Sequence, residues 1–123
     1  MVGKRETGRK GEDLALAYLE ERGLQLLDRN WRSGHREIDL VMGSPGRIHM
    51  VEVKTLTAPM VLEPFEKVDA RKRANLVAAA RSYLAQHRSE DEVQFDVVSV
   101  VFGEPETTIE YLPEAFYPIM NRR

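Results

Sequence analysis

Apolar residues recur at intervals of three and four positions in two parts of the chain, which predicts two amphipathic helices. The first helix covers residues 7–22 and ends before Gly23, because glycine commonly follows the last helical turn. The second begins at Asp69, whose carboxylate can cap the first turn, and continues to residue 87. The apolar faces consist of Leu14, Ala15, Tyr18 and Leu19 in the first helix and of Val77, Ala80 and Leu84 in the second.

Residues 37–55 have the pattern of a β-hairpin. Two stretches, 37–42 and 48–55, alternate between the two faces of a sheet, and the turn sequence GSPG at 43–46 separates them. The predicted faces of the first strand are Ile38, Leu40 and Met42 against Glu37, Asp39 and Val41, and those of the second are Met50, Glu52 and Lys54 against Val51 and Val53.

Three further segments have the pattern of β-strands. Residues 24–32 form a strand that ends at the turn Ser33-Gly34. Residues 93–102 are apolar on both faces, as expected of a covered central strand, and residues 107–112 form a shorter strand. The predicted order is α-β-β-β-α-β-β. We therefore expect an α/β fold with a mixed β-sheet flanked by helices, in one domain over residues 1–123.

The amino-acid composition excludes several kinds of protein and of site. The chain has no cysteine, which excludes disulfide scaffolds, cysteine zinc sites and thiol nucleophiles and is compatible with a reducing cytoplasm. No segment approaches the roughly 20 apolar residues of a membrane span, and no apolar run follows the basic start. We expect a cytoplasmic protein without a membrane partner.

Charge is unevenly distributed along the chain, although the net charge is only −2. Residues 1–88 hold 16 Lys and Arg against 12 Asp and Glu, whereas residues 89–123 hold 2 against 8. The acidic balance argues against a coat protein that covers nucleic acid non-specifically. A basic surface can still form on the first part of the chain, although solvated charges remain an alternative explanation.

The hairpin places charges where a small core would usually hold apolar residues. Asp39 and Glu52 lie on neighbouring strands and can converge, and a divalent cation would relieve their repulsion. Mg²⁺ prefers such oxygen ligands, and the carbonyl of Val53 is a candidate third ligand. Lys54 lies on the face of Glu52, where its side chain can orient the attacking water as an ammonium group or deprotonate it as a neutral amine. The pattern indicates metal-assisted phosphodiester hydrolysis, and a cross-strand salt bridge on a solvated face is the alternative.

Four segments of the chain, in order, resemble the YraN-like family of small bacterial proteins: GRKGEDLALAYLEERGLQLLDRNWR, EIDLV, VEVKT and FDVVSV. That family is assigned to the restriction-endonuclease-like superfamily of PD-(D/E)xK nucleases and is similar to archaeal Holliday-junction resolvases. The resemblance extends to about Phe116 and implies a restriction-endonuclease-like mixed β-sheet flanked by helices. It also implies a catalytic group of Asp39, Glu52 and Lys54, with Glu12 on the first helix as a further acidic member.

Basic residues on both sides of the hairpin are candidate phosphate contacts, because Lys and Arg neutralise the nucleic-acid backbone. A solvated helix face is the alternative for those on the helices. The predicted contacts are Arg9, Lys10, Arg36, Arg71, Lys72 and Arg73.

Together these observations predict a nuclease that depends on Mg²⁺ or Mn²⁺ and acts on DNA, with branched or damaged DNA as candidate substrates. A module that keeps the nuclease fold but only binds nucleic acid or a protein partner is the alternative, and the acidic net charge favours it. A third reading is a structural interaction protein whose hairpin charges form only salt bridges. The resemblance to resolvases, which pair up, also suggests a homodimer.

Overall fold

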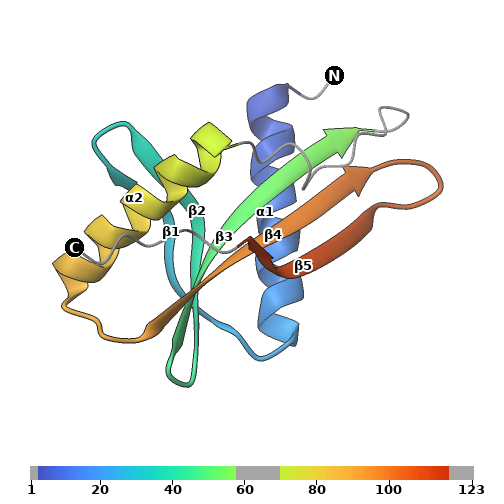
Figure 1. The fold of residues 1–123 in the computed structure, drawn as a ribbon. Coiled ribbons are helices and arrows are strands. Elements are labelled where there is room, and N and C mark those ends of the chain that lie inside the picture. The colour runs from blue at the N-terminus through green and yellow to red at the C-terminus, as the bar shows by residue number, and fades with distance from the viewer. Residues whose placement is uncertain (1–2, 58–69, 117–123) are drawn as a thin grey trace.

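A computed structural model of the chain describes residues 3–57 and 70–116. It has the predicted order of two helices and five strands (Figure 1). The elements are α1 (Lys4–Glu21), β1 (Gln25–Ser33), β2 (Arg36–Ser44), β3 (Arg47–Thr57), α2 (Ala70–His87), β4 (Glu92–Phe102) and β5 (Thr108–Phe116).

The five strands form one mixed sheet in the order β1-β2-β3-β4-β5. Neighbouring strands are antiparallel except β3 and β4, which are parallel. The connection between these two contains α2, as expected because parallel neighbours need a long crossover. The prediction of a mixed sheet flanked by helices, with residues 93–102 as a covered strand, is therefore confirmed.

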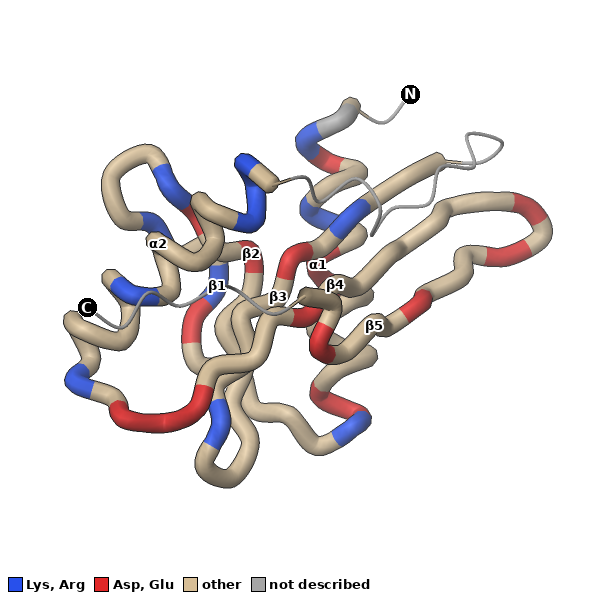
Figure 2. Tube along the Cα trace, viewed as in Figure 1, with Lys and Arg blue, Asp and Glu red and all other residues tan. Residues whose placement is uncertain are grey.

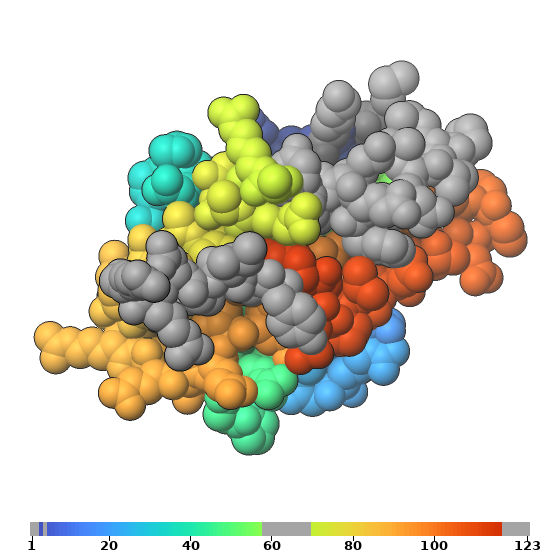
Figure 3. Space-filling view, in the orientation of Figure 1, coloured from blue at the N-terminus to red at the C-terminus, as the bar shows by residue number. Residues whose placement is uncertain are grey.

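Each face of the sheet carries one helix and one apolar cluster. The helices cross the sheet on opposite sides, so the molecule has three layers (Figure 1). In the space-filling view, the surface of α2 and β5 faces the viewer and α1 is visible only at its two ends (Figure 3). The cluster under α2 contains Ile38, Val41, Ile48, Met50, Leu76, Ala79, Ala80, Tyr83, Phe95 and Val97, and the cluster under α1 contains Ala15, Leu19, Leu40, Met42, Val51, Val98 and Val100.

The helix α1 approaches the sheet closely at Gly11. This glycine is buried, and a Cβ added to it would overlap Oγ1 of Thr55 on β3 and lie 3.1 Å from the Cγ2 of that residue. Only a residue without a side chain allows this approach. Gly11 therefore fixes the distance between α1 and the strand that carries Glu52 and Lys54.

A buried polar cluster connects β3, β4 and β5. Asp96 is 1% exposed and accepts hydrogen bonds from Gln94 Nε2, Tyr111 OH, the backbone N–H of Glu114 and His49 Nδ1, at 2.8–2.9 Å. Burial alone raises the pKa of Asp96, but these hydrogen bonds outweigh it and hold the pKa below its ordinary value. The carboxylate therefore stays charged and joins the three strands.

Several details differ from the sequence prediction. Helix α1 begins at Lys4 rather than residue 7, and β5 extends to Phe116. The predicted face of Ile38 is wrong, because Ile38 packs in the cluster under α2 with Val41, whereas Leu40 packs under α1. Strand β2 remains paired with β1 from Leu40 to Ile38, and Asn30 of β1, between the partners of these two residues, has a left-handed φ of 52°, so the regular alternation is interrupted there. The cap at Asp69 lies outside the described residues.

Among the described residues, no helix combines the length and the apolar character that a membrane crossing requires.

Candidate active site

Two carboxylates lie where the β2–β3 ladder ends. The last ladder pair is Leu40 with Val51, and the residues that follow on the two strands are Asp39 and Glu52. The backbone N–H of Val53 donates a 2.9 Å hydrogen bond to Oδ2 of Asp39. Here a side chain of β2 takes the place of a backbone carbonyl as the acceptor for β3. The hydrogen bond holds Asp39 against β3 at the residue that follows Glu52.

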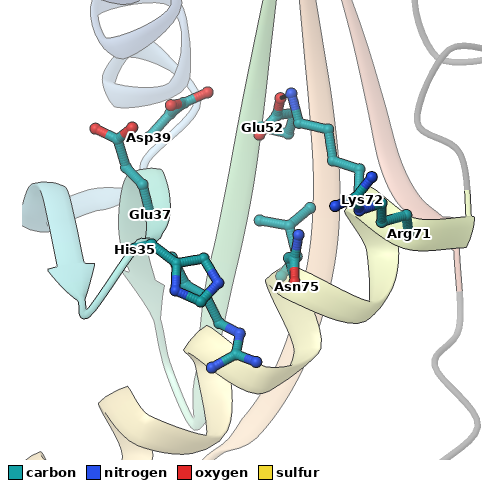
Figure 4. A pocket seen from close by; sticks show the side chains of 9 residues that line it. His35, Glu37, Asp39, Glu52, Arg71, Lys72 and Asn75 are labelled. Atoms are coloured by element: carbon teal, nitrogen blue, oxygen red, sulfur yellow. Dashed lines mark ion pairs between the residues drawn. The ribbon is translucent and has the colours of Figure 1, made fainter.

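Both carboxylates line one cavity of about 370 Å³ between the sheet and the start of α2. Figure 4 shows Glu37 and Asp39 on one side of this cavity, Arg71 and Lys72 on the opposite side, and Glu52 between them. Strands β2 and β3 and helix α2 thus each contribute charged groups to one small space.

Glu52 is held by two lysines. It is 4% exposed, and its Oε2 lies 3.3 Å from Nζ of Lys54 and 2.5 Å from Nζ of Lys72. Lys54 comes from the same strand, whereas Lys72 reaches across from α2. A buried carboxylate requires such partners, because an unpaired charge in the interior is very costly.

The electrostatics of the cavity shift the pKa of Asp39 upward, to about 8. Burial is the largest cause, followed by the negative charge of Glu52, and the hydrogen bond from Val53 opposes both. The charges of Glu12 and Glu37 raise it further. Two carboxylates in one poorly solvated space thus favour a neutral Asp39, which is the condition that a bound cation would reverse.

The two lysines have opposite pKa shifts. Burial lowers the pKa of Lys54, and the adjacent Lys72 lowers it further, although Glu52 opposes both. Burial is the largest single influence on the pKa of Lys72 and acts to lower it. The hydrogen bonds with Glu52 and Lys54 and the charges of Glu52 and Asp39 together outweigh burial, so the pKa of Lys72 is raised. Lys54 is therefore the amine of the pair that loses its proton more readily.

The chemistry of the oxygen donors fits Mg²⁺ or Mn²⁺. Asp39 and Glu52 supply hard oxygen ligands, and Mg²⁺ proteins commonly use one or two carboxylates together with water and substrate phosphate. No group of three or more His, Cys, Asp or Glu suited to a metal ion occurs within residues 3–57 and 70–116. Two carboxylates leave coordination positions that water and substrate phosphate can fill.

Glu12 lies on the α1 side of the same strand end. Its carboxylate is 3.5 Å from Nε of Arg29, and it is partly buried. Its negative charge contributes to the raised pKa of Asp39, which places it within electrostatic reach. Glu12 nevertheless lines a different groove, between α1 and β1.

The six predicted nucleic-acid contacts separate into two groups. Arg36, Arg71 and Lys72 line the cavity of Asp39 and Glu52. The other three lie elsewhere: Arg9 lines the groove between α1 and β1, Lys10 pairs with Glu6 at 3.9 Å, and the guanidinium of Arg73 lies 5.9 Å from the ring centre of Phe116.

Sequence reasoning missed the contact between Lys72 and Glu52 and the contribution of Asn75 to the cavity. Lys72 and Asn75 are three residues apart on α2, so their shared helix face was a usable signal. Nothing in the hairpin pattern indicated which helix face would meet it.

The chain is similar to proteins of one family over most of its length. The profile of the uncharacterised protein family UPF0102 matches residues 11–100, which include Glu12, Asp39, Glu52 and Lys54. A UPF0102 protein of Bacteroides thetaiotaomicron is 38% identical over 118 residues, covering 96% of this chain and 98% of the relative. A UPF0102 protein of Anaeromyxobacter dehalogenans is 41% identical over 115 residues, covering 93% and 86%.

Proposed function

The chain belongs to the UPF0102 family, and we propose that it is a nuclease that hydrolyses phosphodiester bonds in DNA with Mg²⁺ or Mn²⁺. One observation carries the proposal: Asp39 and Glu52, from neighbouring strands, line the same cavity, and Lys54 contacts Glu52. Branched and damaged DNA are the substrates that we propose.

Asp39 and Glu52 would hold the cation, and Val53 would keep Asp39 in place through its N–H. The bound cation would supply Lewis-acid activation of the scissile phosphate and acidification of water. Nζ of Lys54, with its lowered pKa, would accept a proton from the water that attacks phosphorus while the bond from phosphorus to the leaving oxygen breaks.

Arg36 and Arg71 would bind the phosphate oxygens. Both line the cavity, and the buried Nε of Arg36 has no hydrogen-bond partner within the described part of the chain. A buried donor without an acceptor costs about 1–3 kcal/mol, so a phosphate oxygen that relieves it would bind more tightly. Arg36→Ala should therefore weaken substrate binding more than it weakens the fold.

A metal titration followed by heat melting tests the cation site. Mg²⁺ or Mn²⁺ should raise the melting temperature of the wild-type protein and of Glu110→Gln, an exposed carboxylate on β5. The same titration should not change the melting temperature of Asp39→Ala. Equal shifts of the melting temperature in Asp39→Ala and the wild type would exclude the proposed cation site.

Cleavage assays test the activity. Linear, branched and flapped DNAs are incubated with each metal, and the wild type should cleave at least one of them while Asp39→Ala, Glu52→Gln and Lys54→Met do not. The absence of cleavage in both metals would overturn the nuclease proposal.

A second candidate is a non-cleaving module that binds nucleic acid or a protein partner through the same fold. This candidate is supported by Lys54 and Lys72, whose ammonium groups both contact Oε2 of Glu52 and neutralise this carboxylate without a metal. Binding of DNA that persists without metal and without cleavage would favour this candidate.

A further inference from the structure

A second groove lies between α1 and β1, outside the cavity of Asp39 and Glu52. It encloses about 600 Å³ and is lined by Arg5, Gly8 and Arg9 of α1 and by Arg29, Asn30 and Arg32 of β1, with Glu12 and Asp13 on its helical wall. Figure 2 shows basic positions toward the N-terminal ends of α1 and α2, whereas acidic positions mark the β4–β5 side.

Both acidic groups of the groove pair with the same arginine. Arg29 lies 3.5 Å from Glu12 and 2.6 Å from Asp13, and the hydrogen bond with Asp13 is the main cause that raises its pKa. Arg5 and Arg9 are exposed, and neither forms an ion pair with another described residue. They lie one helical turn apart, roughly 6 Å along the axis. With four arginines and two carboxylates on its walls, the groove carries a net positive charge, and Arg5 and Arg9 form no ion pair with a described residue.

Gly8 is a glycine inside a helix at a position where the fold does not require one. It lies inside α1, where glycine costs about 0.5–1 kcal/mol relative to alanine. A Cβ added to Gly8 would meet no described atom within 4 Å, in contrast to Gly11, whose Cβ would overlap Thr55. Packing therefore requires Gly11 but not Gly8. Gly8 lines the groove between Arg5 and Arg9, where a bare backbone lets a ligand approach closely.

The groove adjoins the candidate active site through an ion pair: Arg32, which lines the groove, lies 3.5 Å from Glu37, which lines the cavity. A chain of phosphates that places one phosphate at Asp39 and Glu52 can therefore continue past Glu37 and Arg32 into the groove.

We infer that the groove between α1 and β1 binds the sugar–phosphate backbone of a nucleic-acid strand, with Arg5 and Arg9 on its phosphates and Gly8 facing its sugars. This inference rests on the proposed function, because the strand is the one that enters the cavity. The groove holds phosphates adjacent to the scissile one and contributes affinity without taking part in cleavage.

Fluorescence anisotropy with a labelled DNA oligonucleotide, single-stranded or duplex, tests the inference. Binding is measured in EDTA and in Ca²⁺ over a range of salt concentrations. The double variant Arg5→Gln/Arg9→Gln should bind roughly 10-fold more weakly for each arginine removed, and the slope of log K against log salt should fall by about 2. The charge-matched control Arg22→Gln/Arg88→Gln alters residues beyond the C-terminal ends of α1 and α2 and should keep most of the affinity.

Gly8→Ala separates binding from folding. Alanine should raise the melting temperature, because it favours the helix and meets no neighbour, and it should weaken binding severalfold, because its methyl group enters the groove. A purely structural role for Gly8 would not move stability and affinity in opposite directions.

The inference is overturned if Arg5→Gln/Arg9→Gln binds as tightly as its control with an unchanged salt slope, or if the wild type binds neither probe in either condition. Failure of the proposed function gives a different result. If the wild type binds DNA through Arg5 and Arg9 but cleaves none of the DNAs, the inference about the groove holds and the proposed nuclease activity is excluded.

Discussion

The backbone N–H of Val53 donates to the carboxylate of Asp39 across 2.9 Å, so a residue of β3 fixes the position of an acid on β2. The bond forms where the ladder between the two strands has ended, and it points Asp39 into the cavity that Glu52 also lines. The acid is thereby placed in a poorly solvated space beside a second negative charge, which accounts for its raised pKa.

Asp39 should make the metal-free protein less stable as pH rises. Its folded pKa of about 8 lies above the ordinary value of 3.8, so its contribution is fully present below about pH 4 and is lost as pH increases through 8. Asp39→Asn mimics the neutral acid. Its gain in unfolding free energy over the wild type should begin near pH 4, grow with pH and level off above about pH 8 at several kcal/mol. Urea unfolding in EDTA at several pH values measures this, and parallel profiles would contradict it.

Lys72 should compete with a cation for Glu52. Lys72→Met removes the closer of the two ammonium groups on Oε2, so the apparent affinity for Mg²⁺ or Mn²⁺ should rise severalfold. The metal-free protein should lose about 1–3 kcal/mol, because a buried carboxylate loses a partner. Calorimetric titration and thermal melting measure the two effects. Lys10→Met, which removes an exposed lysine paired with Glu6, serves as the control, and equal metal affinities in the two variants would exclude the competition.

Asp96 should be a main polar support of the sheet. Asp96→Ala leaves donors of four residues without their acceptor, and we expect a loss of about 3–5 kcal/mol at pH 7. The pKa of Asp96 is lowered in the folded state, so its contribution is present above the unfolded pKa and is lost as pH falls through the folded pKa. The difference between Asp96→Asn and the wild type in urea unfolding should therefore shrink below pH 4. A constant difference down to pH 2 would argue against a charged Asp96.

Gly11→Ala should loosen the contact between α1 and β3. Its methyl group would overlap Thr55, and overpacking of this kind costs about 1–3 kcal/mol. Thr55→Ala removes the overlapping atoms, so the double variant Gly11→Ala/Thr55→Ala should regain part of the loss. A double-mutant cycle of thermal unfolding measures the coupling, and additive effects would show that the two residues do not limit the approach.

The sequence by itself determined the seven elements, their order and the charges of the hairpin. Helical and strand periodicities depend on neighbours a few residues apart, so they can be read directly from residues 7–22 or 93–102. The charges of Asp39, Glu52 and Lys54 also stood out locally, because each interrupts an apolar stretch. The family resemblance added Glu12, which no local pattern had indicated.

Only the tertiary structure decided which groups meet. The packing of α2 on the sheet brings Lys72 to Glu52, and at the end of the β2–β3 ladder Asp39 accepts from Val53. The irregularity at Asn30 of β1 accompanies the change of face at Ile38. The close approach at Gly11 sets α1 beside the strand end and leaves the groove that contains Arg5, Gly8 and Arg9. These contacts join residues far apart in the chain, and periodicity carries no information on the position of a helix along a sheet or on the point where two strands separate.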